Sequence, residues 1–419
     1  MRIAALADDV TGATDLAGSW RGRGLRTVVV LGEPNDGDEL VTAGADAVVF
    51  AVKIRSVPAP EATDVASRVG TAIAAMDGVQ VYDKYCSTFD STKEGNIGPI
   101  ADALADAVGA RRAVVVPSMP ANGRTVYQGH LFVHDQLLSE SPMRNHPLNP
   151  MRDSSVVRLL QAQTSRHVGL IPLDTVRQGA QALHSALDEA QAAGSFYLVV
   201  DAIEDSDLEV INAATADDAL VTGGSGLALG ALRSSSTPKP LPTIKGHRLI
   251  LAGSASTATR GQVAVGDAAF PTQALDLTRL SEDPQELAEE LIGWARAHWA
   301  EDPQRPVMIH SAAGTLGERL PGREQSEAVE AVMAHLARLA YDSGARQFLI
   351  AGGETSGSVI NGLGIRYLEL GDEVAPGVSW AKGVRTAEDG SGVERECNLL
   401  LKSGNFGGED LFVTAWEAL

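Results

Sequence analysis

The sequence predicts an α/β protein of two domains, each built on a largely parallel sheet that is flanked by helices. Short apolar runs recur along the chain, helix-like segments follow most of them, and a stretch rich in serine, proline and lysine interrupts the series at 234–247. Alternating β and α segments are typical of a parallel sheet covered on both faces. The chain has 419 residues, more than one typical domain contains.

Strands of the N-terminal half are expected where short apolar runs lead into polar or glycine-rich residues. Helices are expected at Glu61–Ala75, which follows Pro60, and at Ile100–Val108. In parallel sheets, ligands bind outside the carboxyl ends of the strands, so we expect the polar residues that follow these runs to form a site. The expected strands are Ile3–Ala7, Thr27–Leu31, Ala47–Val52, Val79–Tyr82, Ala113–Val116 and Phe196–Val200.

The stretch Ser234–His247 disfavours both helix and central strand because of its prolines and its small polar residues. We place the domain linker there, which gives an N-terminal domain of residues 1–236 and a C-terminal domain of residues 247–419. A second α/β series follows, with helices expected at Pro284–Trp299 and Gln325–Tyr341. Its expected strands are Leu249–Ala252, Gln273–Leu277, Val307–Ile309, Phe348–Ala351, Tyr367–Leu370 and Asn398–Leu401.

A glycine-rich turn follows the run Phe348–Ala351 and precedes apolar residues with helix-like spacing. Small residues let a ligand approach the backbone, and the start of a helix offers unpaired N–H groups to a phosphate. The turn is no Walker loop, because Ser358 stands where that motif needs lysine, and it lacks the spacing of a dinucleotide fold. Taken alone, the segment is better explained as an ordinary tight connection between a strand and a helix. Similar small-residue turns at Gly253–Thr259 and Lys402–Gly408 favour a ligand site.

The charge and composition of the chain exclude several classes of protein. A formal net charge of -20 argues against nucleic-acid or anionic-membrane partners, which need basic patches. No apolar stretch is long enough to span a bilayer, and Asp8 and Asp9 stand where a signal peptide would stay apolar. The two cysteines, Cys86 and Cys397, fit no disulfide or metal framework. We therefore expect a cytoplasmic protein. If its ligands are anions, local Lys or Arg side chains, helix N-termini or a divalent cation must overcome the unfavourable field of the whole chain.

Several long motifs occur in the same order as in the four-carbon acid sugar kinase family, which the chain resembles over almost its whole length. Within that family, the wording at Lys84–Ser87 and Ala121–Gly129 is most similar to the 3-oxo-tetronate 4-kinase branch, and the D-threonate and D-erythronate 4-kinases are the alternatives. The resemblance implies a sugar-acid-binding N-terminal domain and a nucleotide-binding C-terminal domain, with the active site between them. The motifs are Ala7–Asp15, Lys84–Thr92, Gly95–Gly98, Pro120–Gly129, His146–Met151, Ala351–Gly357 and Leu401–Gly407.

The resemblance also implies that ATP phosphorylates a terminal hydroxyl of a four-carbon acid, with Mg²⁺ offsetting the phosphate charge. Asp8 and Asp9 are the expected catalytic residues, one of which would accept or orient the hydroxyl proton. Which of the two does so stays open, and capping of the next helix is the structural alternative. The expected substrate-binding residues, which suit a carboxylate and hydroxyls, are Arg55, Lys84, Ser87, Asn122, Gly123 and Arg124.

ATP is expected at the three small-residue turns of the C-terminal half. Lys402 either covers phosphates or points to solvent, and the metal ligands and any homo-oligomer stay open. A non-catalytic sugar-acid sensor is the alternative from another class, but it would have lost the paired acids or a glycine turn. A lyase or aldolase would need a Schiff-base lysine or a metal cluster, and neither is evident. The expected ATP-binding residues are Ser254, Ser256, Gly352, Gly353, Glu354, Thr355 and Gly404.

Overall fold

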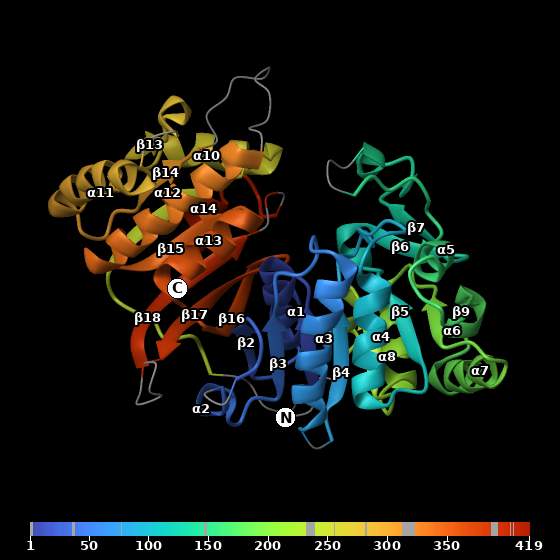
Figure 1. Cartoon of the computed structure of the whole chain (residues 1–419). Coiled ribbons are helices and arrows are strands. Elements are labelled where there is room, and N and C mark those ends of the chain that lie inside the picture. Colours follow the sequence, from blue (N-terminus) through green and yellow to red (C-terminus); the bar gives the residue numbers. More distant parts are fainter. Residues whose placement is uncertain are drawn as a thin grey trace. The chain divides into compact units, whose positions relative to one another are not determined.

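The computed structural model divides the chain into two compact units, Met1–Pro238 and Lys239–Leu419, which we call the N-terminal and C-terminal units (Figure 1). Each unit is described by itself. The structure describes residues 3–35, 38–76, 78–145, 149–231, 239–254, 256–280, 283–311, 323–386, 393–402, 404 and 406–419.

The N-terminal unit contains a parallel sheet with the strand order β2-β3-β1-β4-β11-β5-β10-β9. A small antiparallel sheet, β6-β7-β8, follows β5. The strands are β1 (Ile3–Ala7), β2 (Thr27–Leu31), β3 (Ala47–Ala51), β4 (Gln80–Lys84), β5 (Ala113–Val116), β6 (Arg124–Tyr127), β7 (His130–Val133), β8 (Gln136–Leu137), β9 (Val168–Ile171), β10 (Tyr197–Val200) and β11 (Leu220–Gly223).

Helices cover both faces of this sheet. On one face α3 packs against α4, and on the other α1 packs against α9, which in turn contacts α8 (Figure 1). The strands between them are almost entirely apolar, as a sheet buried on both faces requires. The helices are α1 (Val10–Gly22), α2 (Glu39–Thr42), α3 (Ala59–Ala74), α4 (Ile97–Val108), α5 (Val156–Gln161), α6 (Leu173–Val176), α7 (Ala180–Ala192), α8 (Asp205–Ala214) and α9 (Gly226–Leu229), with 3-10 turns η1 (Pro120–Asn122) and η2 (Pro142–Asn145).

The C-terminal unit has the strand order β13-β14-β12-β15-β18-β17-β16. Five of these strands are parallel, and β17 runs antiparallel to both of its neighbours. The strands are β12 (His247–Ala252), β13 (Thr272–Ala274), β14 (Val307–His310), β15 (Ala345–Ala351), β16 (Tyr367–Ala375), β17 (Val378–Thr386) and β18 (Val393–Lys402). The helices are α10 (Thr257–Asp267), α11 (Pro284–Glu301), α12 (Arg323–Asp342), α13 (Gly353–Leu363) and α14 (Leu411–Thr414), with 3-10 turns η3 (Leu277–Arg279) and η4 (Ala415–Ala418).

The C-terminal segment closes the core of this unit. The rings of Trp380 in β17 and Trp416 in η4 have centroids 5.3 Å apart. Each indole N–H donates to a main-chain oxygen, that of Ala415 for Trp380 and that of Phe412 for Trp416, both at 2.8 Å. Both rings therefore bury a large apolar surface without leaving a polar atom unpaired.

The predicted fold class is confirmed, since each unit holds a largely parallel sheet flanked by helices. Strands β1, β2 and β5 have the predicted bounds. Strands β6, β8, β9, β11 and β17 were not predicted. Among the described residues, no helix combines the length and apolar character that a bilayer crossing requires.

Packing between α12 and α13 generates a stability prediction. A Cβ atom at Gly362 would lie 2.4 Å from the main-chain oxygen of Ala334 in α12, so Gly362→Ala must push the helices apart. We expect urea denaturation to show a loss of about 1–3 kcal/mol in the free energy of unfolding. Gly357→Ala on the same helix is the matched control, because nothing lies within 4 Å of its added Cβ. The control should be neutral or stabilising by about 0.4–1 kcal/mol, and equal effects of the two variants would contradict the packing argument.

Candidate active site

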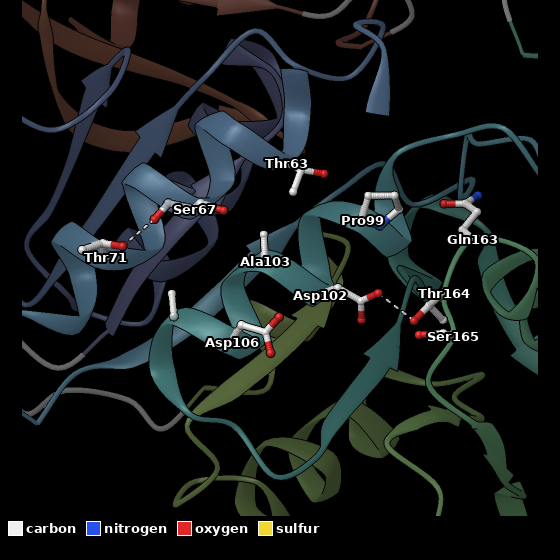
Figure 2. A pocket seen from close by; sticks show the side chains of 11 residues that line it. Thr63, Ser67, Thr71, Pro99, Asp102, Ala103, Asp106, Gln163, Thr164 and Ser165 are labelled. Atoms are coloured by element: carbon white, nitrogen blue, oxygen red, sulfur yellow. Dashed lines mark hydrogen bonds between the residues drawn. The ribbon is translucent and has the colours of Figure 1, made fainter. Parts of the chain in front are cut away.

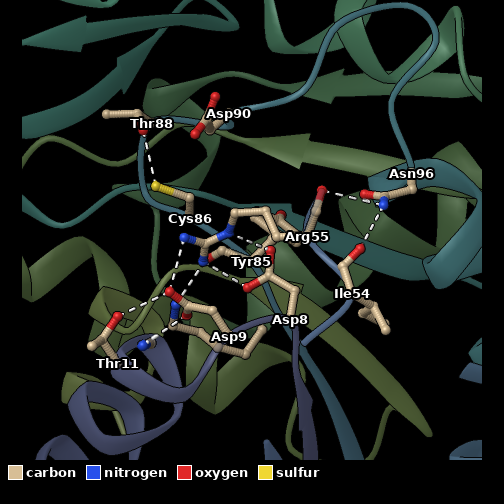
Figure 3. Close-up of polar contacts among 12 residues, drawn as sticks. Asp8, Asp9, Thr11, Ile54, Arg55, Tyr85, Cys86, Thr88, Asp90 and Asn96 are labelled. Carbon is tan, nitrogen blue, oxygen red and sulfur yellow. Dashed lines mark hydrogen bonds and ion pairs between the residues drawn. The ribbon is translucent and has the colours of Figure 1, made fainter. Parts of the chain in front are cut away.

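Two carboxylates lie at the carboxyl end of β1, where α1 begins. Asp9 is the N-cap of α1, and its side chain accepts hydrogen bonds from the Gly12 N–H at 2.8 Å and the Thr11 hydroxyl at 2.9 Å. Asp8 accepts two bonds from the guanidinium of Arg55, from Nε at 2.8 Å and Nη2 at 2.7 Å. The other terminal nitrogen of Arg55, Nη1, lies 3.0 Å from Asp9 Oδ2. One arginine thus holds both acids (Figure 3).

The two acids differ in accessibility. The side chain of Asp8 is 6% exposed and that of Asp9 is 26% exposed. Burial acts to raise the pKa of Asp9, but the charges of Arg55 and Lys84 and the hydrogen bonds from Thr11 and Gly12 outweigh it and lower that pKa below its ordinary value. Asp9 is therefore held ionised, and it is the more accessible of the two side chains to an incoming ligand.

The loop that carries Arg55 is fixed by Asn96, a buried residue at the start of α4. The Asn96 side-chain amide donates to the main-chain oxygens of Ile54 at 2.7 Å and Val57 at 3.0 Å, with a longer bond to that of Arg55 at 3.3 Å. Figure 3 shows Asn96 on the far side of this loop from the acid pair. Sequence reasoning assigned no role to Asn96, although it lies in the quoted motif Gly95–Gly98.

Lys84 joins the acid pair from the end of β4. Its side chain is buried, its ammonium donates to the main-chain oxygen of Tyr85 at 2.8 Å, and its charge acts on Asp9. A Cβ atom at Gly12 would lie 3.1 Å from this ammonium, so Lys84 reaches the first turn of α1. Asp8, Asp9, Arg55 and Lys84, all expected from the sequence, are thus brought together.

Asp83, one residue before Lys84, was missed by sequence reasoning. It is 2% exposed, and one of its carboxylate oxygens has no hydrogen-bond partner within the described part of the chain. Burial, followed by the negative charge of Asp8, raises the pKa of Asp83 well above its ordinary value. The protonated form is favoured, which limits the negative charge beneath the acid pair.

The other four residues that were expected to bind substrate lie apart from these contacts. Among the described residues, no hydrogen bond or ion pair joins them to Asp8 or Asp9. Ser87 is half-buried and packs against Gly224 at the end of β11. Asn122 ends the turn η1, Gly123 follows it, and Arg124 begins β6. The guanidinium of Arg124 donates to the main-chain oxygen of Asn122, and its Nε is buried without a described partner. Arg124 therefore keeps donor capacity for an anion.

A polar groove between α3 and α4 is a separate feature of the N-terminal unit (Figure 2). Its carboxylates are already engaged, because Asp102 accepts from Tyr197 and Thr164 at 2.7 Å each and both Asp102 and Asp106 pair with Arg166. None of the acid-pair residues lines it. The groove is lined by Thr63, Ser67, Thr71, Pro99, Asp102, Ala103, Asp106, Ala107, Gln163, Thr164 and Ser165.

In the C-terminal unit, the three small-residue turns converge. They follow β12, β15 and β18, which are adjacent strands whose last residues, Ala252, Ala351 and Lys402, lie in register. Gly253 N–H and Ser254 N–H donate to the Ala351 oxygen at 3.0 and 3.2 Å, and Gly352 N–H donates to the Lys402 oxygen at 3.0 Å. The turns that follow β12 and β15 are therefore each tied to the last residue of the neighbouring strand.

Close approach explains the residue types of these turns. A Cβ atom at Gly404 would lie 2.6 Å from Ser254 Oγ, so any larger residue would displace the serine turn or its side chain. Gly352 has φ 127, which favours glycine, and precedes α13 as its N-cap. Ser256 caps α10 and donates its hydroxyl to the Gly404 oxygen. Five expected residues, Ser254, Ser256, Gly352, Thr355 and Gly404, thus form one cluster.

The first turn of α13 faces outward from this cluster. Gly353 and Glu354 are both exposed, whereas Thr355 is buried against Gly253. N–H groups in the first turn of a helix have no intrahelical acceptor and attract phosphate. Lys402, which the sequence left as a choice between phosphate and solvent, is fully buried and points inward. Among the described residues, no cluster of three or more potential metal ligands is found.

Comparison with known proteins identifies both units. A family model described as a sugar-binding N-terminal domain matches residues 3–231, and one described as a nucleotide-binding C-terminal domain matches residues 249–412. A 3-oxo-tetronate kinase from Burkholderia multivorans is 41% identical, with 100% of this chain and 97% of the relative covered. One from Pseudomonas fluorescens is 42% identical, with 99% and 96% covered.

Solved structures agree with these matches. A crystal structure from Salmonella typhimurium LT2, of a protein described as a tRNA synthase, has a TM-score of 0.86 and 40% identity, with 99% of this chain and 98% of that chain covered. One from Haemophilus influenzae has a TM-score of 0.82 and 37% identity, with 99% of each chain covered. This chain belongs to the four-carbon acid sugar kinase family, which contains these 3-oxo-tetronate kinases.

Proposed function

We propose that this protein is an ATP-dependent 3-oxo-tetronate kinase that phosphorylates the 4-hydroxyl of its four-carbon acid. The observation that carries the proposal is that each unit holds a different kind of site. The N-terminal unit holds an ionised carboxylate beside basic groups, which suits a hydroxylated acid. The C-terminal unit holds three converging small-residue turns, which suit phosphates. The names of the relatives supply the substrate.

Asp9 is the residue that we assign to the reacting hydroxyl. The hydroxyl oxygen attacks the γ-phosphorus, the bond from that phosphorus to the bridging oxygen breaks, and ADP leaves. The hydroxyl proton passes to the Asp9 carboxylate. Because the transition state of phosphoryl transfer is loose, orientation of the hydroxyl contributes more than strong basicity, and a low pKa is compatible with this role. Asp8 is tied to Arg55 through both of its oxygens and serves to position that guanidinium.

The remaining groups of the two sites bind and orient the sugar acid and ATP in this proposal. Arg124 and Lys84 are proposed to hold the carboxylate of the sugar acid, with Ser87 and Asn122 close to its hydroxyls. The turns at Ser254, Gly353 and Gly404 are proposed to hold ATP. Magnesium takes few protein carboxylates when phosphates complete its shell, and Glu354, which is exposed in the first turn of α13, is the carboxylate that would hold it. Bound there, Mg²⁺ would offset the negative charge of the phosphates.

A role with nucleic acid does not fit the charge of this chain. The Salmonella structure is described as that of a tRNA synthase, but a net charge of -20 opposes contact with a polyanion. We propose small-molecule partners only. Use of ATP, together with the free thiols of Cys86 and Cys397, supports a place in the cytoplasm.

A coupled ADP-release assay over 3-oxo-tetronates, D-threonate and D-erythronate tests the proposed activity. We expect the highest kcat/KM with a 3-oxo-tetronate. A preference for D-threonate or D-erythronate would keep the kinase and change its substrate. Absence of ADP release with every four-carbon acid would refute the proposal and favour a sensor.

Asp9→Asn should reduce kcat by about 100-fold or more, the scale expected for losing a general base. The variant should stay folded, because the amide oxygen can still accept the Gly12 N–H. Asp283→Asn is the matched control, since Asp283 caps α11 by a 2.8 Å bond from Gln285 N–H and is exposed. A near-normal kcat for Asp9→Asn would indicate that Asp9 serves only as the cap of α1. Partial recovery at high Mg²⁺ would assign it to metal binding instead.

Gly353→Val should raise the KM for ATP at least about 10-fold and leave the KM for the sugar acid nearly unchanged. A side chain on this exposed first-turn residue would keep phosphates from the N–H groups. Gly357→Ala, one helical turn later, is the control and should change neither constant. Equal losses for both substrates in Gly353→Val would indicate a turn that is structural only.

A further inference from the structure

The ammonium of Lys402 is enclosed at the end of β18. Lys402 is fully buried, and its Nζ donates to Gln262 Oε1 at 2.6 Å, to Thr259 Oγ1 at 2.9 Å and to the Gly404 main-chain oxygen at 3.0 Å. Gln262 and Thr259 belong to α10, which Ser256 caps. The Gly404 oxygen also accepts from the hydroxyls of Ser256 and Thr259. Lys402 therefore ties its own turn to the first turn of α10.

Gln262 extends this network along the same turn. It is fully buried, and its amide nitrogen donates to the main-chain oxygens of Phe406, Gly407 and Gly408 at 3.0, 3.1 and 2.9 Å. In a trans peptide, the C=O and the following N–H point in opposite directions. The N–H groups of Gly407 and Gly408 consequently face away from Gln262. A turn whose carbonyls are drawn inward presents donors on its other side, which is the arrangement that binds anions.

No carboxylate balances the ammonium in the part of the chain that the structure describes. The side chains around it are the amide of Gln262, the hydroxyl of Thr259 and the Phe412 ring, whose centroid is 5.9 Å away. Burial alone lowers the pKa of Lys402 to about 8. Among the described residues, no ion pair joins the ammonium to the acids on the neighbouring segments, Asp267, Glu409 and Asp410. An unpaired buried cation is costly unless an anion joins it.

We propose that Lys402 and Gln262 are positioning residues for the nucleotide phosphates. They fix Gly404 and residues 406–408 against the cap of α10, and Lys402 adds a positive charge beneath them. The inference rests on the proposed function in one respect, which is that the C-terminal unit binds ATP. The ligand class is a nucleoside di- or triphosphate. Its negative charge would balance the Lys402 ammonium, which no described carboxylate does.

Titration of the full chain with ADP by calorimetry tests this proposal. Lys402→Met and Gln262→Leu should each raise the Kd for ADP and the KM for ATP by at least about 10-fold, the scale of one hydrogen bond to a charged group. The KM for the sugar acid should change less than about 2-fold. Lys245→Met is the matched control, because Lys245 is an exposed lysine of the same unit. The double variant should bind ADP no more weakly than the worse single variant, since the two residues act on one turn.

A pH series on the unmodified protein tests the charge without any substitution. ADP affinity should fall as the pH rises from 7.5 through about 8 to 9.5, because the Lys402 ammonium loses its proton while the phosphates stay ionised throughout. Binding near pH 8 should take up protons, and Lys402→Arg should abolish the pH dependence because arginine stays charged. Constant affinity over this range would overturn the charge role.

The outcomes separate this inference from the proposed function. If the unmodified chain binds ADP and both single variants bind it as tightly, the positioning role is refuted while the kinase proposal stands. If the unmodified chain binds neither ADP nor ATP, both are refuted.

Discussion

The candidate active site depends on one guanidinium that lies between two adjacent carboxylates. Asp8 and Asp9 follow each other at the end of a buried strand, where two negative charges would repel each other and lack solvent. Arg55 donates to both, and Asn96 fixes the backbone from which Arg55 extends. Lys84 adds a second positive charge. This balance lets Asp9 stay ionised and partly open to solvent while it caps α1.

In the C-terminal unit, buried side chains likewise fix the main chain of the small-residue turns. Phosphate binding needs backbone N–H groups that point outward, so the carbonyls of the same turns must be satisfied inside the protein. In the last turn, the side chains of Lys402 and Gln262 donate hydrogen bonds to these carbonyls. In the serine turn, Ser254 accepts a hydrogen bond from the Ser256 N–H, and Ser256 caps α10. Glycine at 352 and 404 removes the side chains that would keep the three turns apart.

Much of the fold could be predicted because its strands are short apolar runs and its helices follow them. The runs Ile3–Ala7 and Thr27–Leu31 coincide with β1 and β2. Strand β17 was missed because Ser379, Lys382 and Arg385 interrupt its apolar residues. It is held instead by antiparallel pairing with β16 and β18, a long-range contact that no local pattern reveals. Strand β4 was expected to end at Tyr82 because Asp83 and Lys84 are charged, yet both are buried.

Site residues could be predicted by type and position, but their partners could not. Two acids at a strand end indicate a functional pair, whereas the arginine between them comes from 47 residues away. A lysine at a strand end is expected in solvent. Lys402 is buried because its acceptors on α10 lie 143 and 140 residues away in the chain.

The central claim is that the acid pair serves the sugar acid and the converging turns serve the nucleotide. Hydrogen–deuterium exchange of the full chain, measured by mass spectrometry with each ligand alone, tests this division most directly. ADP should protect the peptides that contain Gly253, Gly352 and Gly404, and a 3-oxo-tetronate should protect those that contain Asp9 and Tyr85. Protection by ADP at Asp9 and Tyr85, with none at the three glycine turns, would contradict it.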